Sequence, residues 1–88
     1  MKISTREECH RFLKSAAFVH YYEISSDSVH YVDTYSTKGL SWGVVFEVLC
    51  PSTPDVSFNI CEDTKTLQIL RKGEIIGQFR LGRGEEND

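Results

Sequence analysis

The feature that most constrains the fold of this chain is one amphipathic segment followed by short apolar runs, each ending at turn residues. Six runs have the composition of β-strands: 18–25, 28–36, 40–50, 56–61, 66–71 and 74–81. The gaps between them are short, so consecutive strands should pair as antiparallel hairpins. The pattern predicts an α+β domain in which an N-terminal helix packs on one face of a curled antiparallel meander sheet of about five to six strands.

The N-terminal segment carries the signals of a helix start. Ser4 or Thr5 can cap the helix, and Glu7 or Glu8 can complete a capping box three residues later. Apolar residues then follow at helical spacing: Cys9, Phe12, Leu13, Ala16 and Ala17. We expect this single apolar stripe to cover one face of the sheet.

Length and cysteine content favour one domain in a reducing compartment. The 88 residues suit a single domain over 1–81, with 82–88 as a flexible acidic tail. Cys9, Cys50 and Cys61 form no CxxC motif, and their odd number leaves one unpaired in any disulfide scheme. They are typical of reduced thiols, so we expect a cytoplasmic protein.

Charge is unevenly distributed along the chain, whose net charge is −3. Residues 15–64 carry seven acidic residues and a single basic one, Lys38. The field of this segment would repel nucleic acid and anionic membranes and would favour a basic protein partner. Solubility alone can also place such charges on turns, so this bias does not by itself define a function.

One strand register gathers most apolar residues on a single face. It pairs Ile24 with Val29, Tyr22 with Tyr31, His20 with Asp33, Tyr35 with Trp42, Asp33 with Val44 and Tyr31 with Phe46. The face that the helix should cover then contains Phe18, Tyr22, Ile24, Val29, Tyr31, Tyr35, Trp42, Val44, Phe46, Val48, Val56, Phe58, Ile60, Leu67, Ile69, Ile75, Phe79 and Leu81.

The opposite face is predicted to collect two cross-strand rows. These rows are Tyr21–Val32–Val45 and Glu23–His30–Glu47. Carboxylates around an aromatic side chain suit contact with a basic protein patch. The predicted partner-binding residues are therefore Tyr21, Glu23, His30, Val32, Val45 and Glu47.

Two side-chain groups also permit a catalytic interpretation. Glu23, His30 and Glu47 could exchange protons or begin a metal site, but three ligands are too few to close a zinc site. Cross-strand charge pairing explains the same residues. His20 beside Asp33 resembles the orienting half of a catalytic triad, although a buried polar pair is the simpler interpretation. We predict no catalytic residue, metal or cofactor.

The aromatic stretch from Phe18 to Tyr35 invites comparison with nucleic-acid stacking platforms. Such platforms need lysine and arginine alongside the rings, and this stretch has neither. Direct nucleic-acid binding is therefore not predicted.

The sequence thus favours a non-enzymatic protein-binding domain. The leading hypothesis is a small inhibitor of a basic, nucleic-acid-processing protein, of the immunity, antitoxin or phage anti-defence (anti-CRISPR-like) type. A second hypothesis is an adaptor or subunit that assembles by sheet-edge pairing or homodimerisation. A third is a small hydrolase that uses His30 with Glu23 or Glu47.

Overall fold

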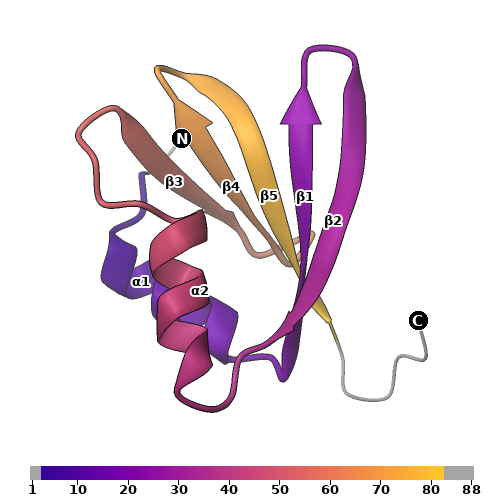
Figure 1. Ribbon diagram of the computed structural model, residues 1–88. Helices are drawn as coiled ribbons and strands as arrows, with labels where there is room; N and C mark the ends of the chain where they lie inside the picture. The colour runs from indigo at the N-terminus through magenta and orange to yellow at the C-terminus, as the bar shows by residue number, and fades with distance from the viewer. Residues whose placement is uncertain (1–2, 83–88) are drawn as a thin grey trace.

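The computed structural model describes residues 3–82, and the predicted tail from residue 83 onward lies outside them. Two helices and five strands follow one another in this order: α1 (Arg6–Lys14), β1 (Phe18–Ser25), β2 (Ser28–Ser36), α2 (Ser41–Leu49), β3 (Val56–Cys61), β4 (Thr66–Arg71) and β5 (Glu74–Gly82). Both helices contribute to one core with the sheet (Figure 1). The α+β class and the N-terminal helix on an open antiparallel sheet are confirmed.

The five strands are ordered β2-β1-β5-β4-β3 across the sheet. The β1–β2 hairpin and the β3–β4–β5 meander are joined because β1 pairs antiparallel with β5. In an uninterrupted meander each strand pairs with the next strand along the chain. β2 does not pair with β3, so the sheet is not an uninterrupted meander. The chain instead leaves β2 through α2 and reaches β3 at the opposite edge of the sheet (Figure 1).

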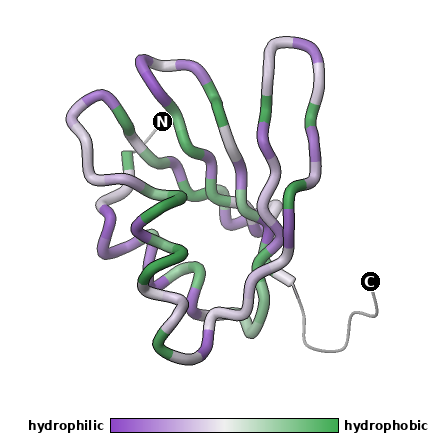
Figure 2. The backbone as a smooth tube through the Cα atoms, viewed as in Figure 1, coloured by the Kyte–Doolittle hydropathy of each residue, from purple (hydrophilic) through white to green (hydrophobic). Residues whose placement is uncertain are grey.

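The prediction of a strand over 40–50 is wrong, because this segment forms α2. Figure 2 shows hydrophobic residues recurring through this helix. The segment fits both strand and helix periodicity. Alternate residues are apolar, as in a strand, and a second apolar set follows at helical spacing. The helical set is the one that packs against the core: Trp42, Val45, Phe46, Leu49 and Cys50. All three cross-strand pairs predicted for this segment (Tyr35 with Trp42, Asp33 with Val44, Tyr31 with Phe46) are consequently absent, and Val44 and Val48 are exposed.

The helix-covered face was predicted correctly in β3 and β4 and, apart from Ile75, in β5, but not in β1 or at Val29 and Tyr31 of β2. Ile75 is exposed and Ile76 packs against the core instead, because the β4–β5 register shifts beside this residue. Val56, Phe58, Ile60, Leu67, Ile69, Phe79 and Leu81 all belong to the core or pack against it. In β1, Val19 and Tyr21 face the helices, whereas Phe18 is exposed. The long-range pairing with β5 accounts for this, because it sets Val19 opposite Leu81 and Tyr21 opposite Phe79.

A β-bulge changes the register within the β1–β2 hairpin. The pairs Ile24–Val29 and Tyr22–Tyr31 form as predicted. Between Tyr21 and Tyr22 the register shifts, so Tyr21 lies opposite Asp33 and His20 opposite Thr34. The predicted pairs His20–Asp33 and Tyr21–Val32 are therefore wrong. His20 Nδ1 instead forms a 2.7 Å hydrogen bond with Thr34 Oγ1.

The predicted helix start is confirmed in atomic detail. Thr5 Oγ1 accepts a hydrogen bond from the backbone N–H of Glu8, and Glu8 Oε1 accepts one from the backbone N–H of Thr5. This reciprocal pair is a capping box. The helix ends at Lys14, so Ala16 and Ala17 of the predicted apolar stripe lie beyond it. Within residues 3–82, neither helix is long and apolar enough to cross a membrane.

Candidate binding surfaces

The six residues predicted to bind a partner do not share one face. Glu23 and His30 lie opposite each other in the β1–β2 hairpin, as predicted. Val45 and Glu47 lie on α2, outside the sheet. Tyr21 is half-buried, and Val32 is the exposed extra residue of the bulge. Both predicted rows lose their third member because 41–49 is a helix, and the bulge also separates Tyr21 from Val32.

Tyr21 faces the interior of the protein. Its ring centroid lies 5.0 Å from that of Phe79. It also covers Gly77, where an added Cβ would lie 2.9 Å from the Tyr21 hydroxyl. Burial, with a smaller contribution from the Glu23 carboxylate, raises the pKa of Tyr21 above its usual value of 10.0. These contacts make Tyr21 a packing residue, so its predicted place at the centre of an exposed surface is wrong.

Glu47 is held in an ion pair between the two helices. Arg6 Nη2 donates to both carboxylate oxygens, at 2.5 and 2.8 Å. The guanidinium carbon of Arg6 also lies 5.0 Å from the centroid of the Phe46 ring. Glu47 is therefore neutralised by α1 and lies away from Glu23 and His30, contrary to the predicted row.

His30 instead belongs to a short polar chain near the tip of the β1–β2 hairpin. Its Nε2 lies 3.1 Å from Ser28 Oγ, which lies 2.7 Å from Ser25 Oγ. An imidazole beside a hydroxyl can activate a nucleophile. Hydrolysis also requires preorganised donors for the developing oxyanion in a water-excluded site, whereas Ser25 at the end of β1 and His30 in β2 are exposed.

The β1–β2 hairpin is acidic and aromatic along its length. We call residues 18–36 the acidic hairpin, because they include Glu23, Asp27 and Asp33 but no lysine or arginine. Its turn lies far from both helices in Figure 1. On the face away from the helices, the rings of Tyr22 and Tyr31 meet edge to face, with centroids 5.7 Å apart. The hydroxyl of Tyr31 forms a 2.6 Å hydrogen bond with Thr34 Oγ1, which orients an exposed ring.

A second surface follows α2. Leu40, Val44 and Val48 are 98%, 67% and 70% exposed, and their spacing of four residues aligns them along the helix. We call these three residues the α2 ridge. The same spacing is visible in the sequence, but the strand interpretation assigned Val44 and Val48 to the core. A contiguous apolar strip on a small protein's surface is a candidate protein contact.

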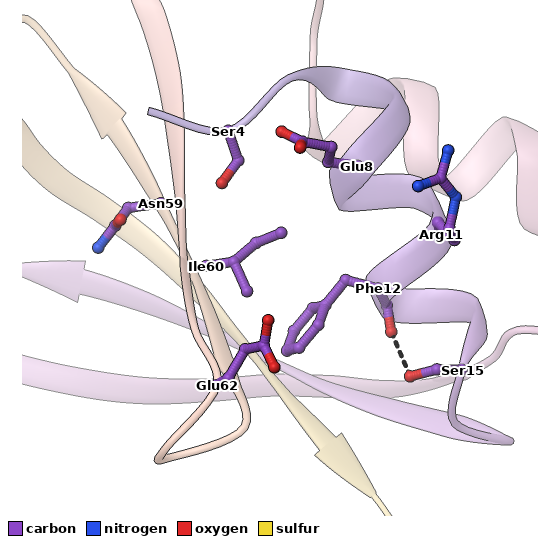
Figure 3. Close-up of a pocket in the computed structure, with 8 residues that line it drawn as sticks. All are labelled: Ser4, Glu8, Arg11, Phe12, Ser15, Asn59, Ile60 and Glu62. Atoms are coloured by element: carbon purple, nitrogen blue, oxygen red, sulfur yellow. Dashed lines mark hydrogen bonds between the residues drawn. The ribbon is translucent and has the colours of Figure 1, made fainter. Parts of the chain in front are cut away.

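A hollow of about 530 Å³ lies between α1 and β3 (Figure 3). The side chains of Phe12 and Ile60 point into it, and Ser4, Glu8, Arg11, Ser15, Asn59 and Glu62 complete its lining. Ser4 donates a 2.9 Å backbone hydrogen bond to Phe58, so the N-terminal segment already pairs with part of this sheet edge. Glu8 is engaged in the capping box.

Side chains suited to metal binding are dispersed. Within residues 3–82, no group of three or more His, Cys, Asp or Glu side chains is placed to hold a metal ion.

Comparison with known proteins adds no assignment: no family model, curated protein or solved structure matches this chain.

Proposed function

We propose that this chain is a non-enzymatic protein-binding domain that engages a basic protein through the acidic hairpin. The observation that carries the proposal is the combination of charge and exposed aromatic surface on one projecting element. Glu23, Asp27 and Asp33 lie in a segment, residues 18–36, without lysine or arginine, and Tyr31 is 57% exposed. Aromatic side chains supply contact area, and carboxylates direct a basic partner toward them.

Within this class we favour an inhibitor of a nucleic-acid-processing protein. Proteins that bind phosphate backbones present lysine and arginine clusters, and an acidic hairpin is complementary to such a cluster. Immunity proteins, antitoxins and phage anti-defence (anti-CRISPR-like) proteins are the types of inhibitor that fit this chemistry. The acidic charge of the hairpin and its lack of lysine and arginine support this narrower proposal.

Assembly through the outer edge of β2 is less well supported. The bulge at Val32 and the charged Asp33 lie on this edge strand, and both features hinder pairing with another strand.

The test compares what wild-type protein and two charge-reversal variants capture from a host lysate. Glu23→Lys with Asp33→Lys reverses the hairpin, and Glu62→Lys with Asp63→Lys makes the same net change at the β3–β4 turn. We expect a basic protein to be retained by wild type and by the turn variant but lost by the hairpin variant. Equal retention by all three proteins would refute the role of the hairpin.

Tyr31→Ala tests the aromatic face of the same hairpin. If Tyr31 is a hot spot, the substitution should cost on the order of 2 kcal/mol of binding, mainly through faster dissociation. Val29→Ala is a suitable control, because Val29 is 61% exposed on the same strand but offers far less contact area. Surface-immobilised binding kinetics with the captured protein measure both.

A further inference from the structure

The α2 ridge points directly away from the core. Trp42 and Phe46 are buried on the opposite side of the helix, and at 100° per residue Leu40, Val44 and Val48 lie on the solvent side. Leu40 also has right-handed helical backbone angles, so the ridge begins at the N-cap. Three large aliphatic side chains in one row are thus left in water by the folded monomer.

Gly43, beside the ridge, has no explanation within the monomer. It lies inside α2, its φ is not in the left-handed region, and an added Cβ would meet no atom within 4 Å. Glycine is among the poorest residues for a helix interior. A glycine at this position is useful where a second backbone approaches closely.

A shallow hollow extends the ridge toward α1. It has a volume of about 340 Å³ and is lined by Arg6, Glu7, His10, Gly43, Phe46 and Glu47. This hollow lies between the Gly43–Glu47 row and α1, over the ring of Phe46, and the missing side chain of Gly43 leaves it open toward the ridge. Aliphatic side chains from another helix can enter such a groove.

The charges near the ridge suit a second copy of this chain. Glu47 is the only charged residue of α2, and Arg6 neutralises it. Two ridges can therefore meet without bringing unpaired carboxylates together. The acidic hairpin has the opposite character, because two of them would repel each other. Self-association is thus electrostatically permitted at α2 and opposed at the hairpin.

The ridge is also self-complementary under two-fold symmetry. If two α2 helices pack antiparallel with the axis beside Val44, this residue meets Val44 of the second copy and Leu40 meets Val48. Rows of residues four apart interdigitate at a crossing angle of about 50°, the commonest helix packing class. We propose that this protein forms a two-fold homodimer through the α2 ridge, with Val44 on the axis and Gly43 allowing the close approach. Each dimer would display two acidic hairpins.

The first test measures mass in solution by sedimentation velocity across a concentration series reaching about 100 μM, where micromolar dimers are populated. Wild type should sediment as a dimer of the 10.1 kDa chain. Val44→Glu should be a folded monomer, because two carboxylates would meet on the axis. Val29→Glu is the matched control, since Val29 is 61% exposed on the hairpin, and it should remain dimeric. Circular dichroism establishes that each variant is folded.

The second test examines the symmetry. Val44→Lys alone should also be monomeric, and mixing it with Val44→Glu should restore a dimer, because opposite charges then meet at the axis. Gly43→Ala should raise the melting temperature of the monomeric Val44→Glu background while weakening wild-type dimerisation at least tenfold. If Gly43 has no role in the dimer, Gly43→Ala should raise the melting temperature and leave dimerisation unchanged.

Three results would overturn the proposal. A monomeric wild type would show that the ridge does not bind a second copy of this chain. A dimeric Val44→Glu variant would place the dimer contact elsewhere on the protein. Failure of the mixed Val44→Glu and Val44→Lys variants to associate would exclude the two-fold arrangement. None of these measurements requires a basic partner, so their outcome is separate from that of the hairpin experiments.

Discussion

At the scale of single residues, Phe46 and Val48 distinguish the helix from the strand predicted for this segment. A strand would place both side chains on the covered face, because they are two residues apart. In α2, Phe46 is only 5% exposed and packs its ring 4.7 Å from that of His10, whereas Val48 lies on the solvent side. A strand predicts similar burial for the two side chains, whereas in α2 Phe46 is buried and Val48 is exposed.

We expect Phe46→Ala to cost about 3–5 kcal/mol of unfolding free energy, as large-to-small changes in a packed core do. Val48→Ala should change the same quantity by about 0.5 kcal/mol or less in monomeric protein. Urea denaturation of both variants in the Val44→Glu background measures the contrast without a contribution from dimerisation. Comparable large losses in the two variants would indicate that both residues are buried.

The two buried cysteines give the protein a pH dependence at the alkaline end. Burial raises the pKa of Cys9 and of Cys50 from 9.0 to about 12. The folded state holds these protons more tightly than the unfolded chain. Their contribution to stability is therefore complete below pH 9 and decreases as the pH rises toward 12.

We expect the unfolding free energy to decrease above about pH 9, with burial of Tyr21 and Tyr35 acting in the same direction. Cys50→Ala should make this decrease shallower, whatever its effect on stability at neutral pH. Denaturant titrations at a series of pH values measure the slope. An unchanged slope in the variant would show that the Cys50 thiol does not contribute to it.

At the scale of elements, the sequence predicted the features that depend on interactions between residues close together in the chain. The capping box at Thr5 and Glu8 and the covered face of β3, β4 and most of β5 follow from residues close in sequence, and Ile75 is the exception in β5. The face of β1 could not be predicted in the same way, because both of its faces carry aromatic residues and β5, more than fifty residues later, selects Val19 and Tyr21. The candidate site was affected most, since it combined residues from β1, β2 and a strand that is a helix.

The capping box offers a test of α1 as an element. Thr5→Ala removes the side-chain acceptor for the Glu8 N–H and should cost about 1 kcal/mol of unfolding free energy. Thr53→Ala serves as the control, because Thr53 is exposed in the α2–β3 connection. Thermal and urea denaturation compare the two. Equal losses would indicate that the Thr5 side chain does not stabilise the helix.

At the scale of the whole molecule, the acidic hairpin and the α2 ridge are separate surfaces of different chemistry. The hairpin is charged and aromatic, and we assign it to a basic partner. The ridge is aliphatic and nearly neutral, and we assign it to a second copy. The sequence predicts the acidic bias and permits homodimerisation. It could not locate either surface, because the fold of 40–50 decides which residues remain exposed.

The central claim, that the acidic hairpin directs binding to a basic protein, is tested most directly by the association rate constant with the captured partner. We predict that this rate falls at least tenfold when the ionic strength rises from about 0.02 to 0.2 M, because screening shortens the reach of the carboxylates. Glu23→Lys with Asp33→Lys should slow association at low salt, while Glu62→Lys with Asp63→Lys should have a much smaller effect. An association rate that is independent of salt and equal in both variants would contradict the claim.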